Sequence, residues 1–204
     1  MPLLLIRHGE TALNATRVVQ PVDTPLSETG LRQALALAKR LAAEPLTALV
    51  SSDLARAAMT ADPVARATGL PVMSEPLLQE RNFGDLRGRA YDTLGFDPIA
   101  MDDAPPNGES IPAFRDRVAR AFTNVLALQA RTGGTVAVFS HGLVVRAILE
   151  SHVALGDGVE VPERIENTSV TRIEDEPPYR VTLLNCVAHL AADERGAAHG
   201  IAGI

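Results

Sequence analysis

The segment "LLLIRHGET", residues 3–11, constrains the fold more strongly than any other part of the chain. Its four consecutive aliphatic residues, 3–6, are too few for a buried helix but are typical of a strand that a parallel sheet buries on both faces. Arg7 and His8 follow directly, where such a strand would leave the sheet. In open α/β sheets, ligands bind at this carboxyl end of the strands. The segment therefore predicts an α/β sheet with polar chemistry at one edge.

Two later segments repeat this pattern. "LTALVSSD" runs from apolar residues into the serine pair 51–52, and "TVAVFSHG" ends in His141 and Gly142. If the three strands are parallel neighbours, their polar ends meet at one edge of the sheet. A helix is predicted after the second and the third strand, and both N-termini would point to the same place. Free backbone N–H groups and the helix dipole favour an anion there.

Strand-like and helix-like segments alternate along the rest of the chain, which implies a layered α/β domain. Apolar residues at helical spacing predict helices over 27–44, 53–69, 113–131 and 143–155, and extended segments over 46–52, 70–76, 135–140, 165–174 and 179–190. Ser27 is the expected N-cap of the first helix. Pro63 is expected to bend the second helix, and Gly69 to end it.

Residues 85–112 break the alternation. This segment carries Pro98, Pro105, Pro106 and Pro112 together with several glycines. Long irregular segments inside compact domains are usually lids or binding loops. We therefore expect an insertion that covers the site.

Composition limits the partners of this domain. The 204 residues are 46% hydrophobic and carry a formal charge of -6, so no overall basic field attracts nucleic acid or an anionic membrane surface. An anion site must then be a local cluster of cations. Cys186 is the single cysteine, which rules out an intrachain disulfide and suits a reducing compartment. The first apolar run is too short for a signal peptide, and no segment approaches transmembrane length. A soluble, cytoplasmic protein is expected.

The polar residues at the predicted edge describe a phosphate site. Arg56 lies in the first turn of the second predicted helix and would join Arg7, His8 and His141 there. Guanidinium groups match phosphoryl oxygens in geometry and charge. A proton donor for a leaving group is still missing from this set. Glu80, in "LLQERNFGDLRG", is the candidate.

At this point the chain resembles the histidine phosphatase superfamily, which is also called phosphoglycerate mutase-like. The segments that carry the resemblance occur in family order from Leu3 to about Leu190: "LLLIRHGET", "PLSETGLRQA", "VSSDLARAAMTA", "LLQERNFGDLRG", "PPNGES", "VFSHGLVVRAIL", "ENTSVT" and "LNCVAHL". The resemblance implies a three-layer α/β/α sandwich around a mainly parallel sheet. It gives one domain over 1–190 with a short lid over about 85–112, and residues 191–204 are expected to form a mobile tail.

The family also implies roles for the site residues. His8 is the nucleophile that becomes phosphohistidine, and Glu80 first protonates the leaving oxygen and then activates water. By the same resemblance, the phosphoryl group is bound by Arg7, Arg56 and His141. No metal and no organic cofactor is implied. The expected substrate is a small phosphorylated metabolite, and a homodimer is a family-level expectation.

The chemistry of the side chains supports these roles independently. A neutral imidazole is an adequate nucleophile, since its unperturbed pKa is about 6.5, and neighbouring arginines favour its neutral form. Glu80 poses a difficulty, because the same arginines lower the pKa of a carboxyl group while a general acid must be protonated. The charge of a bound phosphate could offset this effect.

Three further residues are candidates for substrate binding, namely Asn14, Gly142 and Arg81. Asn14 is either a turn residue or a residue of the phosphate pocket, and the sequence does not favour one role over the other. Arg81, with Arg87 and Arg89, either contacts a second acidic group of the substrate or belongs to a solvated loop face.

Several functions compete. Phosphomonoester hydrolysis is favoured over mutase activity, because dedicated mutases of this family have longer chains and extra basic residues in the inserted segment, which here is short, Pro-rich and acidic after Arg89. A non-catalytic member that only binds a phosphorylated ligand is the second alternative. A metal hydrolase built on His8 and His141 is disfavoured by the adjacent arginines, and a serine hydrolase by the missing G-x-S-x-G motif.

Overall fold

A six-stranded sheet forms the centre of the molecule. The structure is a computed structural model, and it describes residues 2–192 and 194. The strands are β1 (Leu3–Arg7), β2 (Leu46–Ser51), β3 (Val72–Ser74), β4 (Thr135–Ser140), β5 (Val170–Ile173) and β6 (Val181–Cys186), in the order β3-β2-β4-β1-β5-β6. The first four are parallel to one another, and β5 runs antiparallel to both of its neighbours. The mainly parallel sheet expected from the sequence is confirmed.

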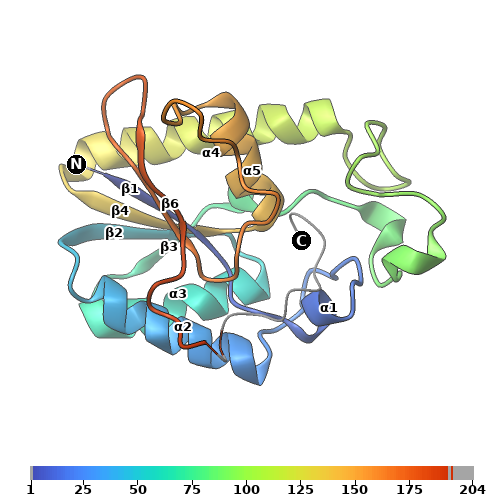
Figure 1. Cartoon of the computed structure of the whole chain (residues 1–204), viewed down its shortest axis with the longest axis horizontal. Coiled ribbons are helices and arrows are strands. Elements are labelled where there is room, and N and C mark those ends of the chain that lie inside the picture. The colour runs from blue at the N-terminus through green and yellow to red at the C-terminus, as the bar shows by residue number, and fades with distance from the viewer. Residues whose placement is uncertain (1, 193, 195–204) are drawn as a thin grey trace.

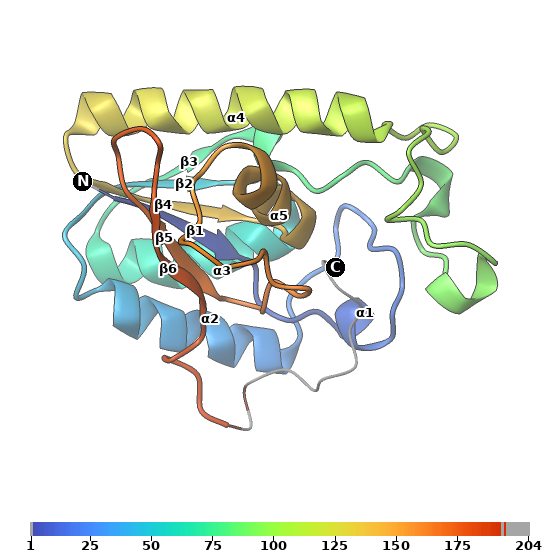
Figure 2. The same cartoon turned by 45° about the horizontal axis from the view of Figure 1, so that its top comes forward.

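Helices cover both faces of this sheet, as Figures 1 and 2 show. On one face lie α2 (Glu28–Leu41) and α3 (Ala55–Thr68), and on the other α4 (Ile111–Thr132) and α5 (Gly142–Ser151). Strand β1 is buried throughout, because Leu3 and Leu5 pack into the core beneath α4 and α5 while Leu4 and Ile6 pack beneath α2 and α3. The three-layer α/β/α sandwich is therefore confirmed. Burial of β1 on both faces explains why residues 3–6 are all aliphatic.

The helix ends follow the sequence signals. Ser27 caps α2 by accepting a hydrogen bond from the Gly30 N–H, and Gly69 ends α3 in the left-handed conformation. Pro63 lies buried inside α3, which continues past it. Several boundaries differ from the prediction: α2 ends at Leu41 rather than at residue 44, α4 begins earlier, after the N-cap Ser110, and α5 ends at Ser151.

The predicted lid is a long irregular segment that leaves the sandwich beside the carboxyl ends of the parallel strands (Figure 2). Its regular structure is limited to the short 3₁₀ turns η2 (Gly84–Leu86) and η3 (Tyr91–Thr93). The last two residues of the predicted 85–112 segment already belong to α4. Most of the tail predicted over 191–204 lies outside the described residues. No described helix has the length and hydrophobicity required to cross a membrane.

Candidate active site

The three predicted strand ends meet at one place. His8 follows β1, His141 lies between β4 and α5, and Arg56 stands in the first turn of α3, which follows β2. Glu80 arrives from the loop after the turn η1 (Pro76–Leu78). A narrow cavity is lined by the side chains of His8, Arg56 and Glu80. The structure thus brings together the residues that the sequence marked as a phosphate site.

Hydrogen bonds fix the ring of His8. Its Nδ1 lies 2.7 Å from the carbonyl oxygen of Gly9. Because a carbonyl oxygen only accepts, Nδ1 carries the proton and Nε2 keeps its lone pair. Burial, followed by the charges of Arg56 and Arg7, holds the pKa of His8 well below its ordinary value. His8 is therefore a neutral imidazole with a defined nucleophilic atom.

The loop that carries His8 is held by close backbone packing. A Cβ atom on Gly9 would lie 2.8 Å from the Gly30 carbonyl oxygen, and one on Gly30 would lie 2.0 Å from the Glu10 carbonyl oxygen. Only glycine fits at these two positions. Glu10 accepts a hydrogen bond from the Ser27 hydroxyl at 2.8 Å, so its carboxylate shapes the loop.

His141 lies beside His8, with their ring centroids 5.2 Å apart. Its Nε2 is 2.9 Å from the Ser52 hydroxyl. Its Nδ1 is buried and has no hydrogen-bond partner within the described part of the chain. Burial, followed by the charge of Arg56, lowers the pKa of His141 well below its ordinary value. A buried, unpaired ring nitrogen at this position is suited to a ligand atom.

The two arginines are buried cations that lack a carboxylate partner. Arg7 donates to the Ile165 carbonyl oxygen, and Arg56 donates to that of Pro21 at 3.2 Å. The Nε atom of each has no partner among the described residues, and neither arginine forms an ion pair there. Burial lowers the pKa of both to about 10, so both are charged at neutral pH. Buried charges of one sign are costly unless a group of opposite charge lies beside them. The two arginines are therefore suited to bind an anion.

Burial shifts the pKa of Glu80 upward, whereas it shifts the pKa values of the two arginines downward. Its carboxyl group accepts hydrogen bonds from the backbone N–H groups of Arg81 at 2.9 Å and Leu143 at 3.2 Å, the latter in the first turn of α5. Burial raises the pKa of Glu80, and this effect exceeds the lowering by those two hydrogen bonds and by Arg56 and Arg7. Burial therefore opposes the lowering by the arginines that the sequence predicts, and it does so before any phosphate binds.

Asn14 has the turn role that the sequence offered, and it is not among the residues that line the cavity. It belongs to the short helix α1 (Ala12–Ala15) and forms a capping box with Thr11. Its amide nitrogen is nevertheless buried and has no partner among the described residues. This donor is available to a ligand. Gly142, the first residue of α5, is buried next to His141.

Arg81 does not belong to the solvated loop face that the sequence offered as one alternative. Its side chain borders the cavity but is only 1% exposed, so it is no part of a solvated face. Its guanidinium donates to lid carbonyl oxygens of Glu109, Pro98, Ile99, Met101 and Asp103. With its donors directed to these five acceptors, Arg81 anchors the irregular 85–112 segment beside the cavity. The sequence did not reveal this, because backbone acceptors in an irregular loop leave no residue pattern.

Sequence reasoning missed several residues of the site region, among them Ser52 and Tyr91. Ser52 orients His141, as described above. Tyr91, in the lid, has a buried hydroxyl without a partner among the described residues, and burial followed by the nearby Glu80 raises its pKa. Arg87 lines the cavity as well, and this half-buried cation lies near Arg56.

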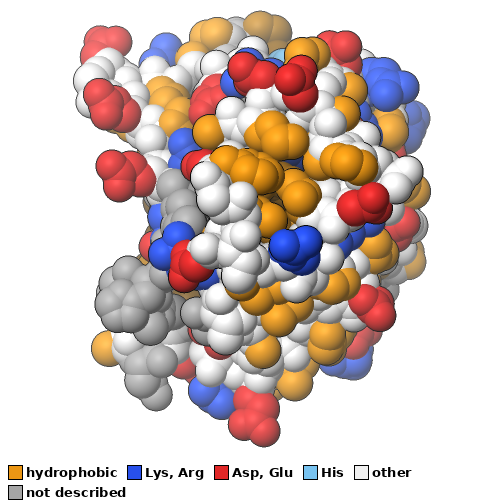
Figure 3. Space-filling model, turned by 90° about the vertical axis from the view of Figure 1, so that its right-hand side faces the viewer, with side chains coloured by type: hydrophobic (Ala, Val, Ile, Leu, Met, Phe, Trp, Pro, Cys, Tyr) orange, Lys and Arg blue, Asp and Glu red, His pale blue; other side chains and the backbone are white. Residues whose placement is uncertain are grey.

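Figure 3 looks onto this side of the molecule, where hydrophobic side chains gather at the centre. In the described chain, no three His, Cys, Asp or Glu side chains are grouped to hold a metal ion.

Comparison with known proteins agrees with this geometry. The sequence pattern of the histidine phosphatase superfamily (branch 1) matches residues 3–186. The chain belongs to this superfamily. The match spans every segment on which the sequence resemblance rested except the end of "LNCVAHL".

Relatives within the superfamily carry different activities in their names. A probable phosphoglycerate mutase GpmB of Yersinia pestis (strain Pestoides F) is 33% identical over 194 residues, which cover 88% of this chain and 87% of the relative. Among solved structures, a phosphoglycerate mutase from Bacillus anthracis str. Sterne has a TM-score of 0.80 at 27% identity, covering 93% of this chain and 94% of its own. The mycobacterial glucosyl-3-phosphoglycerate phosphatase has a TM-score of 0.75 at 27% identity, covering 91% and 99%.

Proposed function

We propose that the protein is a metal-independent phosphomonoester hydrolase that forms a phosphohistidine intermediate on His8. One observation carries the proposal: a neutral His8 with its lone pair on Nε2, two buried arginines without carboxylate partners, and a carboxyl group with a raised pKa occupy one site. These are a nucleophile, an anion binder and a general acid. The substrate class is a small phosphorylated metabolite, since the cavity is narrow.

The first step transfers the phosphoryl group to the protein. His8 Nε2 forms a bond to phosphorus while the bond from phosphorus to the ester oxygen breaks. The proton on Glu80 moves to that oxygen, so the leaving group departs as an alcohol. The charge on the phosphoryl oxygens is stabilised by Arg7, Arg56 and His141, whose neutral ring carries its proton on Nδ1 when Nε2 accepts a hydrogen bond from the Ser52 hydroxyl.

The second step returns the enzyme to its starting state. Glu80 is now a carboxylate and takes a proton from a water molecule, whose oxygen attacks phosphorus. The bond between phosphorus and Nε2 breaks, and inorganic phosphate leaves. The same residue acts first as acid and then as base, which balances the proton over one turnover.

Hydrolysis of p-nitrophenyl phosphate in excess EDTA tests the proposal. The wild type is expected to turn over in EDTA, and His8→Ala is expected to be inactive. His152→Ala is the matched control, because His152 stacks on Phe122 away from the site and should leave turnover unchanged. Loss of activity in EDTA, or full activity of His8→Ala, would overturn the proposal.

Phosphoglycerate mutase activity is the second candidate, supported by the names of two of the relatives. The lid argues for hydrolysis, because it carries Asp92, Asp97, Asp102 and Asp103 after Arg89, and these carboxylates disfavour a doubly phosphorylated intermediate. Incubation with 3-phosphoglycerate decides between the two. Release of inorganic phosphate supports hydrolysis, whereas isomerisation without release supports the mutase.

A further inference from the structure

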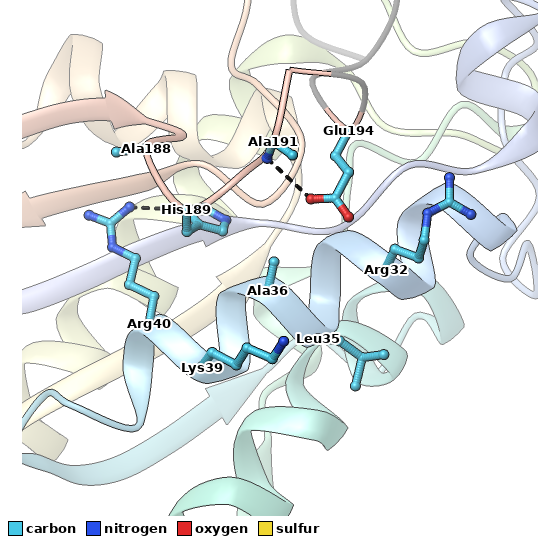
Figure 4. A pocket seen from close by; sticks show the side chains of 9 residues that line it. All are labelled: Arg32, Leu35, Ala36, Lys39, Arg40, Ala188, His189, Ala191 and Glu194. Carbon is cyan, nitrogen blue, oxygen red and sulfur yellow. Dashed lines mark hydrogen bonds between the residues drawn. The ribbon is translucent and has the colours of Figure 1, made fainter.

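A groove separate from the active site lies between α2 and a wall formed by residues 188, 189, 191 and 194, which follow β6. Figure 4 shows Arg40 and His189 at one end, Arg32 at the other, and Ala36 pointing between the two walls. The groove has a volume of about 790 Å³. Sites for small molecules commonly have volumes of about 300–1,000 Å³. Its size therefore suits a metabolite.

The lining is basic in a chain that is acidic overall. Arg32, Lys39 and Arg40 come from α2, and among the described lining residues Glu194 is the one carboxylate, on the opposite wall. None of the three cations forms an ion pair within residues 2–192 and 194. The formal charge of the whole chain is -6, so this concentration of unpaired cations is local. Such a surface attracts a small anion, whereas the acidic remainder of the molecule disfavours a polyanion such as nucleic acid.

Apolar side chains lie between these charges. Leu35, which is 54% exposed, and Ala36 line the α2 wall, and Ala188 and Ala191 line the facing wall. An occupant that satisfies both features has an anionic group at the Lys39 and Arg40 end and an apolar body over Ala36. Glu194 repels the anionic group from the other end.

Hydrogen bonds connect this groove to the catalytic loop. Arg40 Nη1 lies 3.1 Å from His189 Nδ1, and because a guanidinium only donates, the ring carries its proton on Nε2. Burial, followed by the charge of Arg40, lowers the pKa of His189 to about 4, so the ring is neutral at neutral pH. His189 Nε2 lies 3.2 Å from the Thr168 hydroxyl. The Thr168 N–H lies 3.0 Å from the carbonyl oxygen of Arg7 and 3.3 Å from that of His8.

We propose that this groove is a second binding site, for a small organic anion with an apolar body, and that its occupancy alters the phosphate site through Arg40, His189 and Thr168. The anion pairs with Lys39 and Arg40. This pairing moves the Arg40 guanidinium away from His189. Because His189 contacts the Thr168 hydroxyl and the Thr168 N–H contacts the carbonyl oxygen of His8, the movement alters the position of the His8 backbone. The site is distinct from the phosphate-binding cavity and does not depend on the hydrolytic activity.

Binding is tested with 1-anilinonaphthalene-8-sulfonate, an anion on an aromatic body, by fluorescence titration of the full chain. Lys39→Gln is expected to weaken the affinity by roughly two- to fivefold, as for an exposed ion pair. Glu194→Gln is expected to strengthen it, because the substitution removes a repelling charge. Arg120→Gln, which removes an exposed cation of α4, is the matched control and should have no effect. Arg56→Gln reports on binding at the phosphate site and should also have no effect.

Two results would overturn the binding site: equal affinities of wild type, Lys39→Gln and Glu194→Gln, or a loss confined to Arg56→Gln. The coupling is measured by calorimetric titration of orthovanadate, a phosphate analogue, with and without saturating probe. Linkage requires each ligand to change the affinity of the other by the same factor. His189→Ala should retain probe binding and lose this change. An orthovanadate affinity that the probe does not alter would refute the coupling.

Discussion

His8 and Glu80 line the same cavity, and burial acts on them in opposite directions. It lowers the pKa of the imidazole and raises the pKa of the carboxyl group. In each case burial shifts the equilibrium toward the uncharged form, which is the form that a nucleophilic base and a general acid require. Pairs of titratable groups whose environments separate their pKa values are characteristic of acid–base catalysis. The proposed mechanism uses both groups in these forms.

The assignment of Glu80 predicts a dependence on the leaving group. Glu80→Gln should retain orthovanadate binding and slow the hydrolysis of phenyl phosphate by about 10²–10⁴-fold, the usual contribution of a general acid. Hydrolysis of p-nitrophenyl phosphate should show a smaller loss in its first step, because that leaving group needs no proton. Steady-state and burst kinetics of both esters measure this difference. Glu160→Gln, at an exposed carboxylate, is the control, and an equal loss for both esters in the burst phase would contradict the assignment.

The pH profile of kcat/KM should follow the same two groups. Activity requires neutral His8, whose pKa is lowered, so the acid limb should lie below the ordinary imidazole pKa of about 6.5. Activity also requires protonated Glu80, whose pKa is raised, so the alkaline limb should lie above the ordinary glutamate value and disappear in Glu80→Gln. An acid limb at or above the ordinary imidazole value would contradict the buried, neutral nucleophile.

Stability should depend on pH through the same histidine. The folded state holds the pKa of His8 below its unfolded value, so the unfolded state binds more protons and stability falls as pH falls below about 6.5. Glu80 has the opposite sign, because its raised pKa contributes stability at low pH that is lost as pH rises through that value. His8→Asn isolates the first effect. Urea unfolding between pH 7 and 5 should show a slope smaller in His8→Asn by up to about 1.4 kcal/mol per pH unit, and equal slopes would contradict the prediction.

Arg81 should act on the lid. Arg81→Met leaves five carbonyl oxygens without their charged donor, and the loss of such buried contacts should destabilise the lid by about 3 kcal/mol or more. Limited proteolysis within 97–104 should accelerate strongly. Arg89→Gln, at an exposed arginine of the same segment, is the control and should digest like the wild type. Unchanged proteolysis of Arg81→Met would show that the lid is held by other contacts.

Most of the site could be predicted from the sequence because its residues lie at the ends of buried strands. The aliphatic run before Arg7 and the β-branched run before His141 each identify a strand, and a parallel sheet brings strand ends together. Glu80 has no such local signal, since it stands in a loop; the sequence offered it only as a candidate proton donor, and the family resemblance supported that role. The balance of burial against nearby arginines that sets its pKa is a property of the folded chain.

Other features were not predictable for a physical reason. The role of Arg81 rests on backbone oxygens in an irregular segment, which any sequence of that length supplies. The close approach of Gly9 to Gly30 joins a strand end to a helix start that lie far apart in the chain. The basic groove depends on how residues 188–192 and 194 lie against α2, and the periodicity of α2 marks its cations only as an exposed face.

The central claim is most directly tested by trapping the intermediate on His8. Glu80→Gln is mixed with p-nitrophenyl phosphate in EDTA and quenched in alkali, and the peptide that contains His8 is analysed by mass spectrometry. Phosphoryl transfer to Nε2 proceeds with this leaving group, while the water attack that needs a base is slowed. The account predicts a phosphoryl group on His8 that is stable in alkali, lost in acid and absent from His8→Asn. Release of nitrophenol without any phosphoryl group on His8 would contradict it.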